Sequence, residues 1–320
     1  MTGLRRLMRD RRAATGLAIL SILGVVAILA PLLTPFDPNA QPDILRTRFL
    51  APLAAGPDGA IHWLGTDRFG RDILARLMYG ARISLAVGLL SVAVSTVLGL
   101  AVGVTAAMAG GTIERSLMAL TDAALAMPRL VLLLALVALW EPSLLLVVLV
   151  LGVTGWMGIA RLARAEVKGV LARSYVDAAR ATGLSWRRLF WRHLLPNSVT
   201  PVIVAAALAV GNAITLESGL SFLGIGVPPP APSWGNMIAT GRDALVHAPW
   251  IATFPGIAIV LAVVATNLLG DGLRDALDPT TQPPLPAGPP LPSPHLGGPP
   301  PPHPSTQRTP PTPPPHTAGP

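Results

Sequence analysis

The sequence has no cysteine, a single lysine and few charged or aromatic residues. Without cysteine the chain can form neither disulfide bonds nor metal sites with thiolate ligands. Charged residues account for 12% of the chain and aromatic residues for 5%, whereas 51% of the residues are hydrophobic. Soluble globular proteins seldom combine so few charges with so many apolar residues, so this composition favours a membrane protein.

The single lysine also limits the chemistry that the chain can perform. A P-loop places its lysine directly after a glycine-rich turn that surrounds the phosphates of a nucleotide. Lys168 follows Ala165, Glu166 and Val167 instead. The sequence is therefore predicted to have no ATPase site, to hold no cofactor of its own and not to be an enzyme.

The net charge of +8 comes almost entirely from arginine. In a membrane protein such an excess reflects topology more often than nucleic-acid binding, and no nucleic-acid partner is expected. A cluster of arginines precedes the apolar run 16–33 at the N-terminus: Arg5, Arg6, Arg9, Arg11 and Arg12. This run is longer than the hydrophobic region of a cleaved signal peptide, and no small-x-small site ends it. We expect an uncleaved signal anchor.

Six apolar stretches are long enough to cross the hydrocarbon core, which takes roughly 20 residues of helix. They lie near residues 14–33, 83–108, 117–139, 143–160, 199–216 and 250–269. The predicted fold class is an all-α integral membrane protein with six transmembrane helices. Because arginine-rich segments stay in the cytoplasm, the N-terminus and the basic loop 161–197 are expected there, and six spans then return the C-terminus to the same side.

After Pro279 the composition changes abruptly to proline, threonine, glycine and histidine. Such a segment cannot bury enough apolar surface to fold, so residues 280–320 are predicted to be a disordered, inert tail. Its proline runs are also typical of ligands for polyproline-binding partners, a less favoured alternative. His295, His303 and His316 lack the spacing of a metal site, and no metal is expected.

The segment 174–197 is predicted to form two short helices outside the lipid. Ser174 and Asp177 have the spacing of a capping box, and Gly183 can adopt the left-handed conformation that ends a helix. Ser185 can cap a second helix, which Pro196 is expected to stop. A basic helical pair could also bind DNA, but the apolar runs on both sides tether this one to a bilayer. A loop that only fixes topology would need no such caps.

The same residues resemble the EAA loop by which ABC importer permeases dock on their ATPases. The likeness lies in Asp177, Ala178 and Ala179, in Gly183, and in the Leu195–Pro196 pair; Asp177 stands where glutamate is common. Further stretches resemble the C-type permease subunit of dipeptide, oligopeptide and nickel importers: 64–72, 214–224, 232–235, 248–250, 254–256 and 267–279. This resemblance covers nearly everything from residue 61 to residue 279.

The resemblance implies a type I ABC importer permease in the bacterial inner membrane. It also implies its partners: a homologous B-type permease, two cytoplasmic ABC ATPases that bind ATP, an extracytoplasmic solute-binding protein, and membrane lipid. Residues 1–80 would form the N-terminal arm, first transmembrane helix and external segment, 81–279 the permease domain and 280–320 the tail.

The outward loop 227–250 carries prolines and two tryptophans, Trp234 and Trp250, which suit the membrane surface. This composition favours a re-entrant collar or a docking surface for the binding protein.

Small alanines would let the first loop helix enter a groove on the ATPase, while arginines pair with acidic groups at its rim. The residues expected to couple to the ATPases are Ser174, Asp177, Ala178, Ala179, Arg180, Gly183, Leu195 and Pro196.

Ionisable residues inside apolar stretches are costly and frequently functional. Arg129 and Asp122 are expected on one face of the third span, with Asp122 near the cytoplasmic interface and Arg129 deeper, on the translocation path. Glu217 either hydrogen-bonds a broken helix or contacts a peptide amine on that path. The resemblance implies peptides as the cargo, with nickel or another small solute as the alternative. A secondary transporter would require inverted repeats and more mid-membrane ionisable residues than Arg129 alone, and a structural or signalling membrane protein is a third hypothesis.

Overall fold

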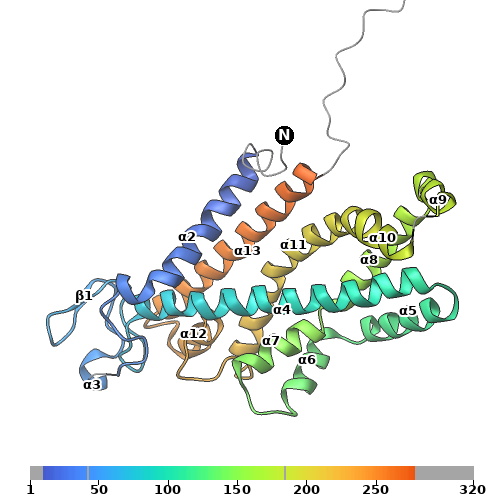
Figure 1. The fold of residues 1–320 in the computed structure, drawn as a ribbon. Coiled ribbons are helices and arrows are strands. Elements are labelled where there is room, and N and C mark those ends of the chain that lie inside the picture. The colour runs from blue at the N-terminus through green and yellow to red at the C-terminus, as the bar shows by residue number, and fades with distance from the viewer. Residues whose placement is uncertain (1–9, 42, 184, 278–320) are drawn as a thin grey trace, which may run out of the picture. The chain divides into compact units, whose positions relative to one another are not determined.

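A computed structural model describes residues 10–41, 43–183 and 185–277. The described residues up to Leu277 belong to one compact unit that is almost entirely helical (Figure 1). Its elements are α2 (Arg11–Leu33), α3 (Ile44–Thr47), β1 (Ala54–Ala55), β2 (Ile61–His62), α4 (Ile73–Ala109), α5 (Gly111–Ala126), α6 (Arg129–Val137), α7 (Leu144–Val153), α8 (Trp156–Leu171), α9 (Ser174–Ala181), α10 (Trp186–Leu189), the π-helix η1 (Phe190–Leu194), α11 (Leu195–Phe222), α12 (Trp234–Gly241), the 3-10 helix η2 (Arg242–Ala244) and α13 (Trp250–Leu277). The two short strands pair antiparallel, with Ala54 opposite His62.

Five helical stretches of the described chain are long and apolar enough to cross a membrane. They are Arg11–Leu33, Ile73–Ala109, Leu144–Leu171, Ser198–Phe222 and Trp250–Leu277. A sixth is possible if the bent pair α5 and α6 counts as one span. The predicted all-α membrane fold is confirmed, although the second helix begins ten residues before the predicted start at residue 83.

The predicted third span, 117–139, is not one straight helix. α5 and α6 meet at an angle of 87°. Pro128 lacks a backbone N–H and forces the residue before it out of the helical region, and Met127 is accordingly extended, with φ −77° and ψ 133°. The expectation that Asp122 and Arg129 share one helix face is therefore wrong. The Oδ1 of Asp122 instead lies 3.6 Å from the Nε of Arg161 in α8.

α4 is the helix around which the others pack. It contacts α8, α11, α7 and α2, while α13 lies beside α2 and α11 (Figure 1). The crossing of α4 and α8 is close because glycines line it: a Cβ added to Gly99 would lie 2.7 Å from the Cβ of Ile159. At Gly103 an added Cβ would meet the carbonyl oxygen of Ala160. Glycine at these two positions therefore lets the two helices approach closely.

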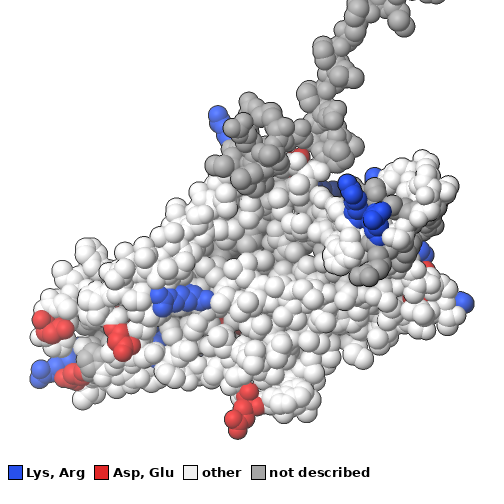
Figure 2. Space-filling model, in the orientation of Figure 1, with Lys and Arg blue, Asp and Glu red and all other residues white. Residues whose placement is uncertain are grey.

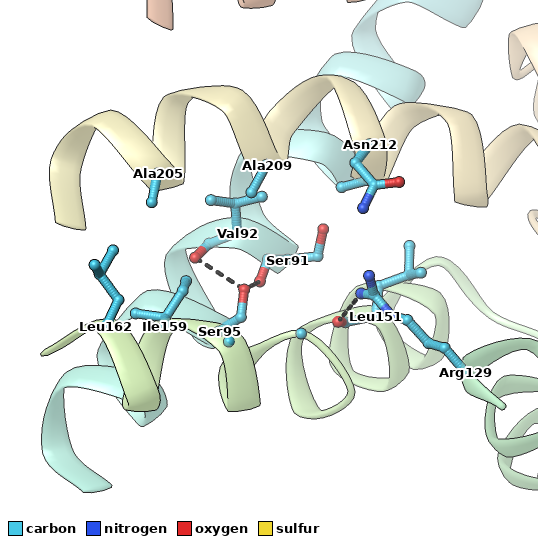
Figure 3. A pocket seen from close by; sticks show the side chains of 13 residues that line it. Ser91, Val92, Ser95, Arg129, Leu151, Ile159, Leu162, Ala205, Ala209 and Asn212 are labelled. Atoms are coloured by element: carbon cyan, nitrogen blue, oxygen red, sulfur yellow. Dashed lines mark hydrogen bonds between the residues drawn. The ribbon is translucent and has the colours of Figure 1, made fainter. Parts of the chain in front are cut away.

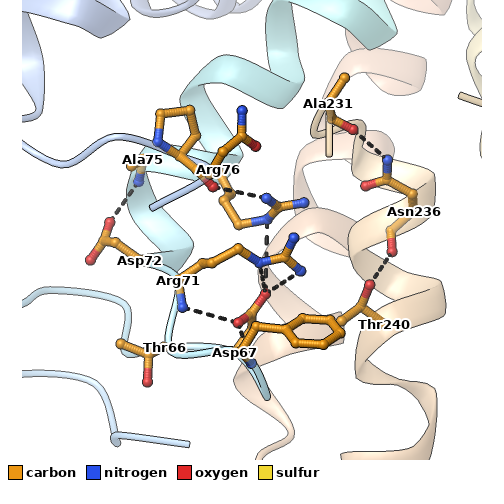
Figure 4. A network of polar contacts seen from close by, with 12 residues as sticks. Thr66, Asp67, Arg71, Asp72, Ala75, Arg76, Ala231, Asn236 and Thr240 are labelled. Atoms are coloured by element: carbon orange, nitrogen blue, oxygen red, sulfur yellow. Dashed lines mark hydrogen bonds and ion pairs between the residues drawn. The ribbon is translucent and has the colours of Figure 1, made fainter. Parts of the chain in front are cut away.

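A buried ionic network holds the start of α4 (Figure 4). Asp72 caps the helix by accepting a hydrogen bond of 2.7 Å from the backbone N–H of Ala75. Asp67 pairs with Arg71, and the Nη2 of Arg71 lies 2.6 Å from the Oδ2 of Asp67. Arg76 donates a hydrogen bond to the carbonyl oxygen of Pro38. These charges are paired and hydrogen-bonded, as buried charges must be. They fix the 34–72 segment against the first turn of α4.

The loop after α11 folds back into the helical unit, and here the prediction for one tryptophan is wrong. Trp234 was expected at the membrane surface but is only 1% exposed. Its indole N–H donates to the carbonyl oxygen of Leu77, and its backbone N–H donates to the hydroxyl of Ser84. Ser233 starts α12 with a capping box formed with Asn236. α12 thus packs against α4, α11 and α13 through the buried tryptophan. Trp250, by contrast, is half-buried.

Charged side chains are unevenly distributed over the face seen in Figure 2. Red and blue side chains gather over the 34–72 segment and, as blue alone, near α9 and α10, while most of the surface between them is uncharged. Many large apolar side chains of the long helices are exposed, such as Ile28 at 72% and Val97 at 67%. An uncharged, apolar belt of this kind is what lipid tails cover in a membrane protein.

Candidate functional site: a helical hairpin and an arginine-lined cavity

α9, α10 and η1 form a short helical hairpin that follows α8 (Figure 1); residues 174–196 are called the hairpin below. The chain reverses at Gly183, whose φ of +77° is left-handed. The predicted left-handed glycine at this turn is confirmed. Four buried residues, one from α8 and the others from the hairpin, form its apolar core: Val170, Val176, Leu189 and Leu194. The hairpin therefore packs directly against the C-terminal end of α8.

The residues predicted to couple to a partner divide into two groups. Exposed positions are Ser174, Asp177, Ala178, Gly183 and Pro196. Ala179 and Leu195 are half-buried, and Ala179 packs against the apolar core of the hairpin. The side chain of Arg180 lies outside the described part of the structure. The outward face of α9 therefore presents Asp177 and Ala178, whereas Ala179 is turned toward α8.

Pro196 does not stop the second hairpin helix, contrary to the prediction. The helix continues from α10 through η1 into α11, where Pro196 occupies the first turn. In η1 the N–H of Leu195 bonds to the carbonyl of Phe190, one residue further back than in an α-helix. The π-helical turn changes the backbone hydrogen-bonding pattern directly before Pro196, so the helix can accommodate a residue without an N–H at this position. The hairpin and the span α11 are thus one continuous helical piece.

An open depression of about 510 Å³ lies on the hairpin beside α10 and η1. It is lined by Ser185, Arg188, Trp191 and Arg192. Trp191 is 65% exposed and lies outside the apolar spans, and tryptophan is a residue type enriched where partners bind. The arginines were visible in the sequence as a basic loop, but the exposed tryptophan between them was missed. A tryptophan flanked by arginines in a segment outside the apolar spans was the available signal.

A cluster of charges ties α8 to α5 just before the hairpin. Glu114 of α5 accepts hydrogen bonds from Lys168 at 2.5 Å and from the Nε of Arg164 at 2.6 Å. Glu114 was not selected from the sequence. Its two partners are 50 and 54 residues away, and only the packing of α5 on α8 brings them together. Since both cations belong to α8, the cluster holds the helix from which the hairpin projects.

Arg129 borders a cavity of about 210 Å³ among the helices (Figure 3). Polar residues of the lining are Ser91 and Ser95 of α4 and Asn212 of α11; the rest is mostly apolar. The guanidinium donates one long hydrogen bond of 3.4 Å, from Nη2 to the carbonyl oxygen of Leu151. Its Nε is buried and has no hydrogen-bond partner among the described residues. The structure thus places Arg129 against a cavity, with a single hydrogen-bond acceptor among the described residues.

Glu217 lies elsewhere, completely buried in a cage of serines. Ser221 donates to it at 2.7 Å, Ser84 at 3.3 Å and Ser218 at 3.4 Å. Ser84 also accepts the backbone N–H of Trp234, so the carboxyl group joins α4, α11 and the start of α12. Glu217 does not line the cavity that Arg129 borders.

The described chain is thus a set of apolar spans packed around α4, with a small helical hairpin at the end of α8. The fold matches a chain of the MetNI methionine ABC transporter in an inward-facing conformation, with a TM-score of 0.54 and 18% identity. The match covers 63% of this chain and 97% of that one. The shared architecture is that of an ABC importer permease.

The chain belongs to the family of binding-protein-dependent transport system inner membrane components, whose model matches residues 73–283. The model for the N-terminal transmembrane domain of oligopeptide transport permease C matches residues 2–52. A permease protein of Brucella abortus is 43% identical over 275 residues, which is 86% of this chain and 90% of that protein. The di/tripeptide transport system permease protein DppC of Pseudomonas aeruginosa is 41% identical over 271 residues, covering 84% and 88%. The C-type resemblance inferred from the sequence is confirmed.

Proposed function

We propose that this chain is a transmembrane permease subunit of an ATP-driven importer and that its cargo is peptides. Family membership makes it the inner membrane component of a system that depends on a binding protein. Peptides are supported by relatives at more than 40% identity, one of which is named for di- and tripeptide transport. The translocation path would lie between this chain and a homologous B-type permease.

One observation carries the coupling mechanism: the hairpin is a compact unit outside the apolar spans, and it is packed on α8. Its outward face offers a small residue, Ala178, next to Asp177, which suits insertion into a groove on a partner. The neighbouring depression adds an exposed tryptophan and two arginines, the residue types enriched where partners bind tightly. We infer that a cytoplasmic ABC ATPase docks here.

Movement of the docked ATPase can reach the membrane without a flexible link. The apolar core of the hairpin joins it to α8, and α8 packs closely on α4 through Gly99 and Gly103. α11 continues directly from the hairpin. When two ATPases close on ATP, the hairpin would therefore carry α8 and α11 with it as rigid elements, which is the kind of motion that alternating access requires.

The remaining assignments follow from this arrangement. Two cytoplasmic ATPases would bind the ATP, an extracytoplasmic solute-binding protein would deliver the peptide, and lipid would surround the apolar belt. The hairpin and both termini would lie in the cytoplasm of a bacterium. Residues 1–80 would form the arm, first span and external segment, 81–279 the permease domain and 280–320 a tail, although the boundary at residue 80 falls within α4.

The proposal is tested by uptake of a labelled peptide into proteoliposomes that contain this chain with its partner permease and ATPases. Uptake should require ATP on the ATPase side and the loaded binding protein on the other side. It should persist when ionophores dissipate all ion gradients. Uptake that needs a gradient and no ATP would instead identify a secondary transporter.

A further inference from the structure

Arg129 is a cation with one hydrogen-bond acceptor among the described residues. A guanidinium carries five N–H donors. Here the described partner is a single carbonyl oxygen, that of Leu151 at 3.4 Å, and the buried Nε has none. Among the described residues, no carboxylate lines the cavity or forms an ion pair with Arg129. A charged group in such surroundings is costly unless an anion or another acceptor reaches it.

The polar groups around the cavity favour an acceptor as the missing partner. The hydroxyl of Ser91 donates to the carbonyl oxygen of Val87 at 2.5 Å, and the hydroxyl of Ser95 donates to the carbonyl oxygen of Ser91 at 2.9 Å. Neither hydroxyl proton therefore faces a ligand in the cavity. Asn212 carries an amide that can donate, and Figure 3 shows it extending from α11 toward the side of the cavity where Arg129 lies. Two donors that converge on one space suit a carboxylate.

Two further features agree with an anion. Arg129 is the first residue of α6, so the positive end of the helix dipole lies at the same place. The cavity, at about 210 Å³, is below the roughly 300 Å³ at which pockets for whole drug-sized ligands begin. It therefore suits one end of a peptide and not a complete peptide.

We propose that Arg129 and Asn212 form a subsite for a carboxylate of the cargo, foremost the C-terminal carboxylate of a peptide. The inference rests on the proposed function, because it takes a peptide as the transported molecule. It adds a preference within that cargo class: a peptide with a free carboxylate should cross the membrane faster than the same peptide with a C-terminal amide.

The first test compares these two forms of one tripeptide in the reconstituted complex, with equal loading of the binding protein verified beforehand. Wild type should take up the free acid faster. Arg129→Gln should lower its uptake by about tenfold, the cost of losing one charge-assisted hydrogen bond, and leave the amide nearly unchanged. Arg129→Lys, which keeps the charge, should retain part of the preference, and Arg161→Gln on the exposed side of α8 should behave as wild type. Equal changes for acid and amide in Arg129→Gln would overturn the proposal.

A second test does not require the binding protein to accept the peptide with a C-terminal amide. Asn212→Asp places a carboxylate at the lining of the cavity, on the side where Arg129 lies, where it would compete with the cargo for the guanidinium. Uptake of the free acid should fall about tenfold in Asn212→Asp and less in Asn212→Ala, with assembly unchanged in both. Equal uptake in the two variants would count against the subsite. Absence of any peptide uptake in wild type would instead reject the proposed function, so the two failures are distinguishable.

Discussion

Gly103 lies where α4 crosses α8, and the space beside it is already filled. A Cβ at this position would meet the carbonyl oxygen of Ala160 and would lie 2.9 Å from the Cβ of Ala163. Backbone cannot move aside as a flexible side chain can, so Gly103→Ala should destabilise the protein by about 1 to 3 kcal/mol.

Gly169 of α8 is the matched control for this substitution, because it is exposed and an added Cβ would meet nothing within 4 Å. Gly169→Ala should stabilise the protein by roughly 0.5 to 1 kcal/mol, since alanine is the better helix former. Thermal unfolding of the two purified variants in detergent measures the opposite signs. A stable Gly103→Ala variant would show that the two helices do not touch in this way.

Glu217 offers a second test at the scale of one residue, because its structural and transport roles predict different phenotypes. The serine cage favours the structural role. Glu217→Gln should keep hydrogen bonds to Ser84 and Ser221 and leave assembly and uptake near wild type. Glu217→Leu should strand those hydroxyls and lower stability by about 1 to 3 kcal/mol.

Uptake and thermal stability of the two variants, measured on the same preparations, separate the roles of Glu217. A glutamine variant that is fully stable but transports poorly would place Glu217 on the translocation path.

The hairpin shows at the scale of an element how two neighbouring alanines can act differently. Ala178 is exposed, whereas Ala179 packs against the core formed with α8. Ala178→Glu should prevent docking of the ATPases while the hairpin stays folded. Ala179→Glu should disrupt the hairpin itself, because it puts a charge against Val176 and Leu189.

Co-purification of the ATPases and limited proteolysis of the hairpin distinguish these two outcomes. Both variants should lose the ATPases, but only Ala179→Glu should become sensitive to protease near residue 180. Retention of the ATPases by Ala178→Glu would contradict the assignment of the outward face as the docking surface.

Much of each element could be predicted from local sequence. Apolar runs located the long helices, and Gly183 located the hairpin turn, because span length and left-handed backbone geometry are local properties. Pro128 and Pro196 show the limit of such reasoning. One breaks a span and the other does not break a helix, since tolerance of proline depends on whether the chain needs that N–H. The partners of Glu114 and the burial of Trp234 depend on contacts between distant segments, which no local pattern contains.

The candidate site was predictable to a similar degree. The hairpin residues were recognised from their resemblance to a known loop, but the division into an outward and an inward face required the packing of α9 on α8. Arg129 was selected because it is a charge in an apolar stretch. That its donors face a cavity with Asn212 could not be predicted, because α6 and α11 are far apart in the sequence.

At the scale of the whole molecule, the proposed function requires the hairpin to lie inside the cell and the 34–72 segment outside. Reporter fusions test this topology. A fusion near Ala55 should be active only in the extracytoplasmic space, and fusions at Thr182 and after Leu277 only in the cytoplasm. An external signal at Thr182 would be incompatible with a docking site for cytoplasmic ATPases.

We propose that this chain transmits a signal from a binding protein outside the cell to ATPases inside it. The most direct measurement is the rate of ATP hydrolysis by the reconstituted complex, with and without peptide-loaded binding protein on the opposite face of the bilayer. Loaded binding protein should stimulate hydrolysis in wild type and in Gly169→Ala, and not when the same amount of ATPase is reconstituted with Ala178→Glu. Hydrolysis that is unaffected by the binding protein in wild type, or stimulated equally in Ala178→Glu, would contradict it.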